Sequence, residues 1–339
     1  LLIIGEAKLR QWIKDNPRMR LYEHYFNDLF RKQTHVRNAE VEELLGMLRD
    51  PFTSTSNTAT MLANADFKFK PAHDSKNKKV ELTQSTFDAI LNGSDRKARQ
   101  TAWENYNDQY LEYKNTLANN LNTSIKQNVF NMKVRNFNSS LESTLFNGNV
   151  PVEMFHNLLD IFKKNLPLWH KYWRVRRKAL GVKTLNPYDV WAPLTTKKYK
   201  VPFEKAVDWI CEGLAPMGEE YVSVMRKGCL QDRWVDWSPN AGKRQGAFST
   251  RVPKDTHPFI LMSYTDDIGS MSTLSHELGH SMHAYYASRA QPMFYYLYPS
   301  IIAETASNFN QAMTRAHLLN TNPNKYFQIA LLEEAMDNF

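Results

Sequence analysis

The 339-residue chain has little of what would define several classes of protein. It contains two cysteines, Cys211 and Cys229, which are too few for a disulfide framework. No apolar run approaches the ~20 residues that span a bilayer, so no membrane partner is expected. Reduced thiols suit a cytoplasmic protein. The apolar content of 42% is low but adequate for a globular core.

The whole chain has a net charge of +8, and acidic residues are scarce in one part of it. Between Lys163 and Lys183 there are eight basic residues and no acidic one, with Trp169, Tyr172 and Trp173 interleaved. Such a mixture is typical of nucleic-acid binding. We favour an amphipathic helix with basic residues on its outer face, and therefore expect no nucleic-acid partner. The expected apolar face consists of Phe162, Leu166, Trp169, Trp173 and Leu180.

The most informative pattern is His276-Glu277-Leu278-Gly279-His280. In this H-E-x-x-H pattern two histidines stand four residues apart, on one face of a helix, and can bind one ion. Glu277 can hold the water that a zinc ion would acidify. Apolar residues recur with helical spacing around the motif, which predicts a largely buried helix over Ser270 to Ala287 with Ser270 as N-cap. A buried helix argues against the alternative, an exposed turn that carries two histidines by accident.

A catalytic zinc site needs a third protein ligand. Glu304 is the best candidate, because a second helix from about Ile301 to Leu319, with Ser300 as N-cap, would return antiparallel to the first. Its neighbours are small or apolar, and an isolated carboxylate there is costly without a cation. We expect His283 to support the site or the core. Other candidate ligands are Glu333, Glu334, Asp337, His283 and His317.

The segments His276 to His283 (HELGHSMH) and Ile302 to Asn310 (IAETASNFN) resemble the thimet oligopeptidase family of zinc peptidases, in particular its oligoendopeptidase F branch. The segments Gly242 to Phe248, His257 to Met262 and Tyr188 to Leu194 are similar to the family too. The resemblance therefore covers essentially the whole chain. It implies one Zn²⁺ per chain on His276, His280 and Glu304, with Glu277 as general base.

Two departures from the family pattern matter. Gln311 stands where the family usually has glutamate, two turns after Glu304, and its neutral side chain should lessen the negative charge near the metal. The family also has a histidine and tyrosines downstream of the zinc glutamate, and the chain stops at Phe339 before them. We therefore expect it to be the middle of a protein nearer twice this length.

The helical period predicts a mainly α fold. The resemblance adds a two-lobed architecture with a deep substrate channel and a small β region beside the motif helix. We expect an N-terminal helical domain with a β-hairpin over residues 1–92, and an incomplete catalytic domain over residues 93–339. In detail, helices over residues 5–50 should end at Asp50-Pro51, Phe67–Phe69 should pair with Val80–Leu82, and residues 185–191 should form a strand.

Residues before the motif helix are expected to bind substrate. Residues 259–264 read as a strand, either an edge strand that pairs with an extended peptide or a purely structural one. Gly246 with Ala247 could likewise let a peptide approach the backbone or have only a structural role. The predicted substrate contacts are Gly246, Ala247, Phe248 and Leu261. The predicted function is a zinc endopeptidase that cleaves short peptides by metal-activated water. A helical zinc carboxypeptidase and a catalytically silent peptide-binding fragment are the alternatives.

Overall fold

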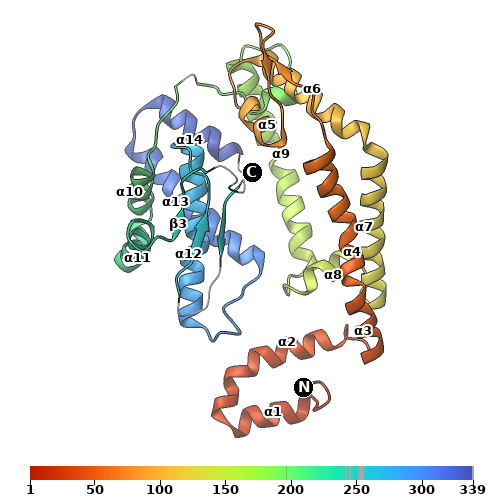
Figure 1. The fold of residues 1–339 in the computed structure, drawn as a ribbon. Helices are drawn as coiled ribbons and strands as arrows, with labels where there is room; N and C mark the ends of the chain where they lie inside the picture. Colours follow the sequence, from red (N-terminus) through yellow and green to blue (C-terminus); the bar gives the residue numbers. More distant parts are fainter. Residues whose placement is uncertain (196, 241–242, 244–245, 251–255, 338–339) are drawn as a thin grey trace. The chain divides into compact units, whose positions relative to one another are not determined.

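The chain folds into two compact, mainly helical units, in agreement with the predicted fold class (Figure 1). The computed structural model describes residues 1–339 apart from residues 196, 241–242, 244–245, 251–255 and 338–339. The first unit comprises residues 1–70 and 104–168, and the second comprises residues 71–103 and 169–339. Helices α6 (Arg96–Glu112) and α9 (Val152–Ala179) each run from one unit into the other. The predicted domain boundary at residue 92 stays a prediction.

The first unit is built from helices that pack along one another. Leu9 and Ile13 of α1 bury against Phe26 of α2. Further along the chain α4 packs against α7, and the ring of His35 stacks on Phe137 with 3.7 Å between centroids. The elements are α1 (Glu6–Asp15), η1 (Pro17–Tyr22), α2 (Glu23–Gln33), α3 (Ala39–Met47), α4 (Arg49–Met61), η2 (Leu62–Asp66), α7 (Lys114–Val134) and α8 (Ser140–Phe146).

Two sequence predictions fail in this unit. Helix α4 begins at Arg49 and continues through Pro51, because a proline in the first turn of a helix gives up no intrahelical hydrogen bond. The segment Phe67–Phe69 forms no strand. Instead, the ring of Phe67 packs edge-on against Tyr110 with 4.8 Å between centroids, so its apolar character serves packing between aromatic side chains.

The second unit combines helices with two small sheets. A hairpin forms from β1 and β2, displaced from its predicted position, and a three-stranded sheet has the order β3-β5-β4. The elements are β1 (Ala72–His73), β2 (Lys79–Val80), α5 (Gln84–Leu91), η3 (Pro187–Asp189), α10 (Phe203–Gly213), η4 (Ala215–Met217), α11 (Glu219–Leu230), β3 (Val235–Asp236), β4 (Phe248–Thr250), β5 (Phe259–Leu261), α12 (Ile268–Ala290), α13 (Ser300–Thr321) and α14 (Lys325–Asp337).

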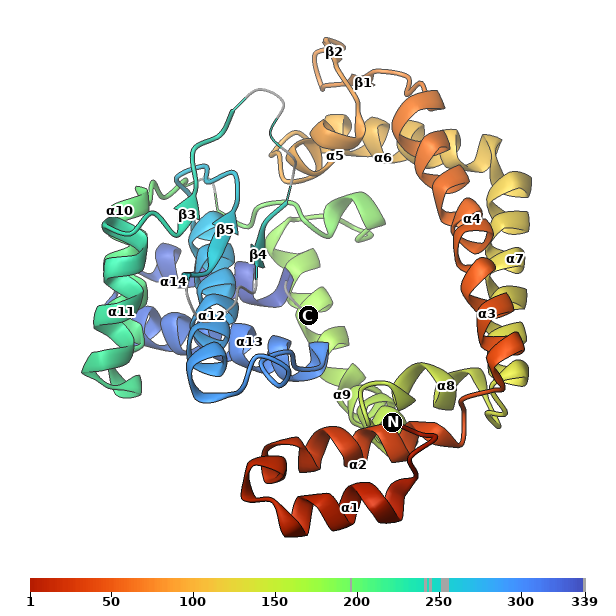
Figure 2. The same cartoon turned by 60° about the horizontal axis from the view of Figure 1, so that its bottom comes forward.

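Strand β5 lies in the centre of its sheet, so the prediction that residues 259–264 form an edge strand is wrong. Ile260 pairs with Val235 of β3 in parallel and with Ser249 of β4 in antiparallel. Both sides of β5 are therefore occupied, whereas β4 has a partner on one side only among the described residues. The sheet packs against α12 (Figure 2).

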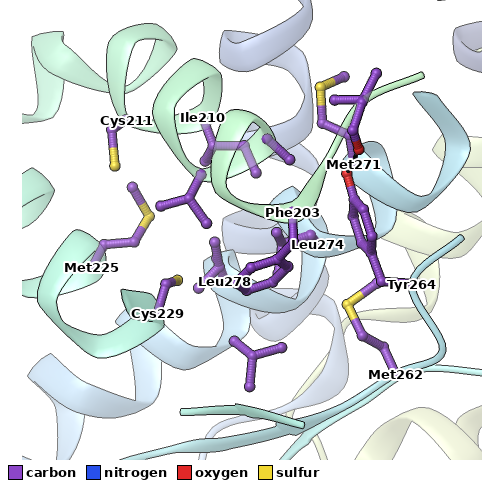
Figure 3. Close-up of a cluster of buried hydrophobic side chains, with 14 of the residues drawn as sticks. Phe203, Ile210, Cys211, Met225, Cys229, Met262, Tyr264, Met271, Leu274 and Leu278 are labelled. Carbon is purple, nitrogen blue, oxygen red and sulfur yellow. Dashed lines mark hydrogen bonds between the residues drawn. The ribbon is translucent and has the colours of Figure 1, made fainter. Parts of the chain in front are cut away.

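The main core of the second unit surrounds α12. Leu274 and Leu278 of this helix are fully buried against α10, α11 and the sheet (Figure 3). Met282 is fully buried in the same core. The expectation of a largely buried motif helix is thus confirmed. Both cysteines are free and lie in this core, where burial raises the pKa of each thiol.

An ionic network joins other parts of the second unit. Residues 185–191 form no strand: Asp189 ends the short helix η3 and is completely buried. Its carboxylate accepts two hydrogen bonds from Arg96, at 2.9 and 2.8 Å, and one from Arg99 at 3.2 Å. Burial raises the pKa of Asp189, but the hydrogen bonds from Arg96, the Asn186 backbone and Arg99 outweigh burial and lower it overall.

The predicted apolar face of α9 is only partly covered. Trp169 and Trp173 are half-buried, whereas Phe162 is exposed. The prediction that Phe162 lies on a buried face is therefore wrong. Among the described residues, no helix is both long and apolar enough to cross a bilayer.

Candidate active site

Helix α12 presents the two motif histidines toward α13. It begins at Ile268, where the carboxylate of Asp267 accepts a hydrogen bond from the Ser270 backbone N–H at 2.7 Å. Asp267 is therefore the N-cap, and the expectation that Ser270 fills this role is wrong. The helix continues through the motif to Ala290, and α13 returns beside it with Glu304 in its second turn.

The ligand atoms of His276, His280 and Glu304 form a compact triangle. The Nε2 atoms of the two histidines lie 3.2 Å apart. Oε2 of Glu304 lies 3.3 Å from Nε2 of His276 and 3.5 Å from Nε2 of His280. These three residues form a candidate metal cluster within the described part of the chain.

This triangle fits a small divalent cation. Tetrahedral zinc has bonds of about 2.0–2.1 Å to imidazole nitrogen and carboxylate oxygen, which sets neighbouring ligand atoms about 3.3–3.4 Å apart. The three observed separations scatter around that value. Two imidazoles and one carboxylate are also the donor set of several catalytic zinc sites, which leave one position open.

Glu304 reaches the histidines without being buried. Its side chain is 52% exposed, so the expectation of an isolated carboxylate in an apolar setting is wrong. A hydrogen bond of 2.9 Å from the Ser307 hydroxyl to Oε2 of Glu304 helps to hold the carboxylate. The case for Glu304 as a ligand therefore depends on its distances to the two histidines.

Glu277 lies between the ligand histidines in sequence and is buried, with 6% exposure. Its Oε2 atom has no hydrogen-bond partner among the described residues. Burial raises the pKa of the Glu277 carboxyl, and the nearby charge of Glu304 adds to the rise. His276 and the Ser249 backbone N–H act in the opposite direction. The result is a carboxylate of raised basicity with one oxygen available to a further donor.

Sequence comparison identifies the family to which this site belongs. The profile described as "Peptidase family M3" matches residues 89–339, and the one described as "Oligopeptidase F" matches residues 1–69. The chain belongs to peptidase family M3. Peptidases of this family are generally metal-dependent. The resemblance to oligoendopeptidase F in the sequence is thereby confirmed.

Individual relatives resemble the M3 chain over its whole length. Oligopeptidase PepF of Bacillus subtilis is 35% identical over 340 residues, which cover all of this chain and 50% of the relative. The oligoendopeptidase F homolog of Borreliella burgdorferi is 33% identical over 345 residues, covering all of this chain and 57% of the relative. The chain thus spans about half the length of the curated relatives it matches.

Solved structures show the same fold. A chain from Chlamydophila abortus superposes with a TM-score of 0.85 at 32% identity, covering 98% of the M3 chain and 56% of that chain. Oligoendopeptidase-F from Enterococcus faecium gives a TM-score of 0.72 at 28% identity, covering 100% of the M3 chain and 54% of that protein's chain.

The two residues predicted to support the M3 site differ in their positions. Nδ1 of His276 lies 2.9 Å from Oε1 of Gln311, so Gln311 directly contacts a candidate ligand. His283 instead stacks on Tyr298, with 3.7 Å between ring centroids and 13° between planes. His283 thus packs next to the loop that joins α12 to α13.

The remaining candidate ligands lie elsewhere. Glu333 accepts hydrogen bonds from Arg176 and from the backbone N–H of Leu194, and His317 lies 3.4 Å from Glu212. Neither these residues nor Glu334 join the candidate cluster. The side chain of Asp337, together with Gly242 from the segment that resembles the family, lies outside the described residues.

The predicted substrate residues gather at β4. Gly246 has a positive φ of 87° just before the strand, a conformation that glycine adopts without strain. Ala247 packs partly against the core, and Phe248 begins β4 with 40% exposure. Leu261 is the register partner of Phe248 on the central strand. The structure therefore pairs Phe248 with Leu261 in one sheet and places Gly246 and Ala247 in the segment that leads into β4.

Two features of the site were missed in the sequence. A Cβ atom on Gly279 would lie 2.6 Å from Cα of Ser307, so this glycine is needed for the close approach of α12 and α13. Ser249 of β4 shares a hydrogen bond of 2.8 Å with the buried hydroxyl of Ser281 on α12. A glycine inside a helix signals close packing, whereas nothing in the sequence pairs the two serines.

Proposed function

We propose that this chain carries the metal-binding half of a zinc endopeptidase that cleaves short oligopeptides. The observation that supports the proposal is the triangle of His276, His280 and Glu304 beside the buried carboxylate of Glu277. Imidazole and carboxylate donors at tetrahedral spacing favour zinc over magnesium or calcium, which prefer oxygen ligands at higher coordination number.

Each residue has a defined task in this proposal. His276, His280 and Glu304 would hold the metal, which when bound supplies Lewis-acid chemistry for peptide hydrolysis. Glu277 would take a proton from the attacking water and deliver it to the leaving amine. Its raised pKa makes it a better base, and its Oε2 atom, which has no partner among the residues that the structure describes, is available to the water. The resemblance assigns the groups that stabilise the oxyanion to residues that follow this region in the family.

Substrate binding is assigned to strand β4. A peptide in extended conformation can add to the free edge of a sheet through backbone hydrogen bonds, which gives affinity with little sequence preference. Within the described part of the chain β4 has such an edge, and its Ser249 lies next to Glu277. Phe248 would contact a substrate side chain, while Leu261 contributes from β5 behind it. Short peptides are the expected substrates because the relatives are named oligopeptidases and oligoendopeptidases.

The decisive experiment compares the wild-type chain with Glu277→Gln. We expect both to bind one zinc ion, and only the wild type to cleave internally quenched peptides blocked at both ends. A carboxypeptidase would leave blocked peptides intact. Loss of zinc from Glu277→Gln, or retained cleavage by it, would contradict the role of Glu277.

A peptide-binding fragment without activity is the second candidate, because the chain spans about half of its relatives. Such a fragment would bind zinc and peptide without turnover. A chain extended to the length of the relatives would then restore cleavage, and Glu277→Gln in that longer chain would abolish it. We also propose a cytoplasmic location, since both cysteines are free and buried.

A further inference from the structure

We propose that Ser272 and Gln311 form a neutral relay that positions His276 and keeps the metal affinity of the site moderate. This inference rests on the metal-binding function proposed above. The relay runs from α12 to α13 and back: Ser272 lies one turn before His276 on α12, and Gln311 faces both from α13. All its polar atoms come from side chains, so each step can be tested by substitution.

The contacts define what each group does. Oε1 of Gln311 lies 2.9 Å from Nδ1 of His276, and Nε2 of Gln311 donates to the Ser272 hydroxyl at 2.9 Å. An amide oxygen only accepts, so the first contact is a hydrogen bond when His276 carries its hydrogen on Nδ1. That tautomer leaves the lone pair on Nε2, the atom that faces His280 and Glu304.

Both side chains of the relay are buried, so the loss of either hydrogen bond is costly. Gln311 is 8% exposed and Ser272 is 7% exposed, so an amide that lost its partner would be left unsatisfied in a site shielded from water. Rotation of the amide by half a turn would place its NH₂ group at Nδ1 and force the ring hydrogen onto Nε2. In the observed orientation the Ser272 hydroxyl accepts from the amide NH₂ group, and the amide oxygen faces the ring.

Because Gln311 is neutral, its hydrogen bond with His276 is weaker than one with a carboxylate would be. Ligand histidines usually donate their second N–H to a carboxylate, a backbone carbonyl or water. A carboxylate accepts a stronger hydrogen bond than a neutral amide and makes the ligand more basic. No acidic side chain contacts Nδ1 of His276 among the described contacts, and Gln311 fills that place. The site therefore has less negative charge behind His276 than a carboxylate would supply.

Zinc affinity measured by competition with a chromophoric chelator at pH 8 tests the proposal. We expect Gln311→Met to weaken binding by about tenfold or more, and Gln311→Glu to tighten it by about tenfold. Ser272→Ala should weaken binding by at least about threefold, and Ser272→Thr should restore it. The matched control is Ser275→Ala, which removes a buried hydroxyl contact of 3.0 Å with Thr314 between the same two helices. Its affinity should equal that of the wild type.

A second measurement separates positioning from packing. Nitrogen NMR of histidine-labelled, zinc-loaded protein should show the hydrogen of His276 on Nδ1 in the wild type and in Ser275→Ala. Ser272→Ala should broaden or shift that signal. Equal zinc affinity in Gln311→Met and the wild type would overturn the relay, and affinity no tighter in Gln311→Glu would overturn its neutral character. Failure of the wild type to bind one zinc ion would instead reject the proposed function.

Discussion

Gly279→Ala tests whether the spacing of α12 and α13 sets the metal site. The added Cβ atom would lie 2.6 Å from Cα of Ser307 and 2.7 Å from the carbonyl oxygen of Ala306. Carbon atoms in ordinary contact are about 3.5–4.0 Å apart, and both obstacles belong to the backbone. The two helices must therefore separate locally by about 1 Å. Glu304 lies one turn before Ser307 and would move with it.

The expected loss of zinc affinity in Gly279→Ala follows from the geometry of the triangle of His276, His280 and Glu304. Ligand atoms in metal sites are placed to within about 0.2 Å, so a displacement of Glu304 by about 1 Å should weaken zinc binding by about 100-fold, the upper end of effects seen for groups around a ligand. Overpacking costs about 1–3 kcal/mol of folding free energy, and the better helix propensity of alanine offsets up to ~1 kcal/mol. We expect a modest loss of stability in the metal-free protein and a large loss of affinity.

Chelator competition and urea unfolding measure the two effects separately. Gly46→Ala is the matched control, because no atom lies within 4 Å of a Cβ atom added there, in helix α3. It should stabilise the protein by about 0.5–1 kcal/mol and leave zinc affinity unchanged. If Gly279→Ala binds zinc as tightly as the wild type, the helix spacing does not determine the site and the reasoning fails.

Three further predictions follow from other contacts. Removal of metal with a chelator should lower the melting temperature of the wild type, and Glu304→Ala should abolish most of this difference; an unchanged difference would exclude Glu304 as a ligand. Because the pKa of Asp189 is lowered by folding, its contribution to stability is full above its unfolded pKa of about 3.9 and is lost as pH falls through the folded value. Urea unfolding of the metal-free protein should therefore show a smaller acid dependence in Asp189→Asn, and equal pH profiles would refute this. Ser281→Ala should lower the free energy of unfolding in urea by about 1 kcal/mol, because it removes the hydrogen bond to Ser249. It should also raise KM for blocked peptides more than it lowers kcat. Equal effects on KM and kcat would argue against β4 as the substrate strand.

The candidate site could be predicted from the sequence where its chemistry is local. The spacing of His276 and His280 places both on one helix face whatever the rest of the chain does. Glu304 followed from an antiparallel return of the next helix, and α12 and α13 do pack side by side. Its expected burial was wrong because small neighbours in the sequence do not reveal which side of a helix is covered.

Predictions that depended on distant partners failed more often. The apolar run over residues 259–264 is equally typical of an edge and of a central strand, and only the pairing of Ile260 with Val235 decides between them. Asp189 lies in a segment that resembles a strand, yet Arg96 and Arg99 bind it in a short helix. These partners are about 90 residues away in the sequence, so no local pattern specifies them.

The position of α13 is determined from two sides, which explains why glycine occurs in both helices that flank it. A Cβ atom on Gly279 of α12 would meet Ser307, and one on Gly213 of α10 would lie 2.8 Å from Cα of Thr314. Helix α13 is thus held at close range between α12 and α10, and its Glu304 and Gln311 project toward the motif histidines. Backbone contacts of this kind deform little. The triangle of donor atoms is therefore determined by helix packing, because the two glycines set how closely the helices approach. The hydrogen bonds of Ser307 to Glu304 and of Gln311 to His276 then fix the orientation of these two side chains.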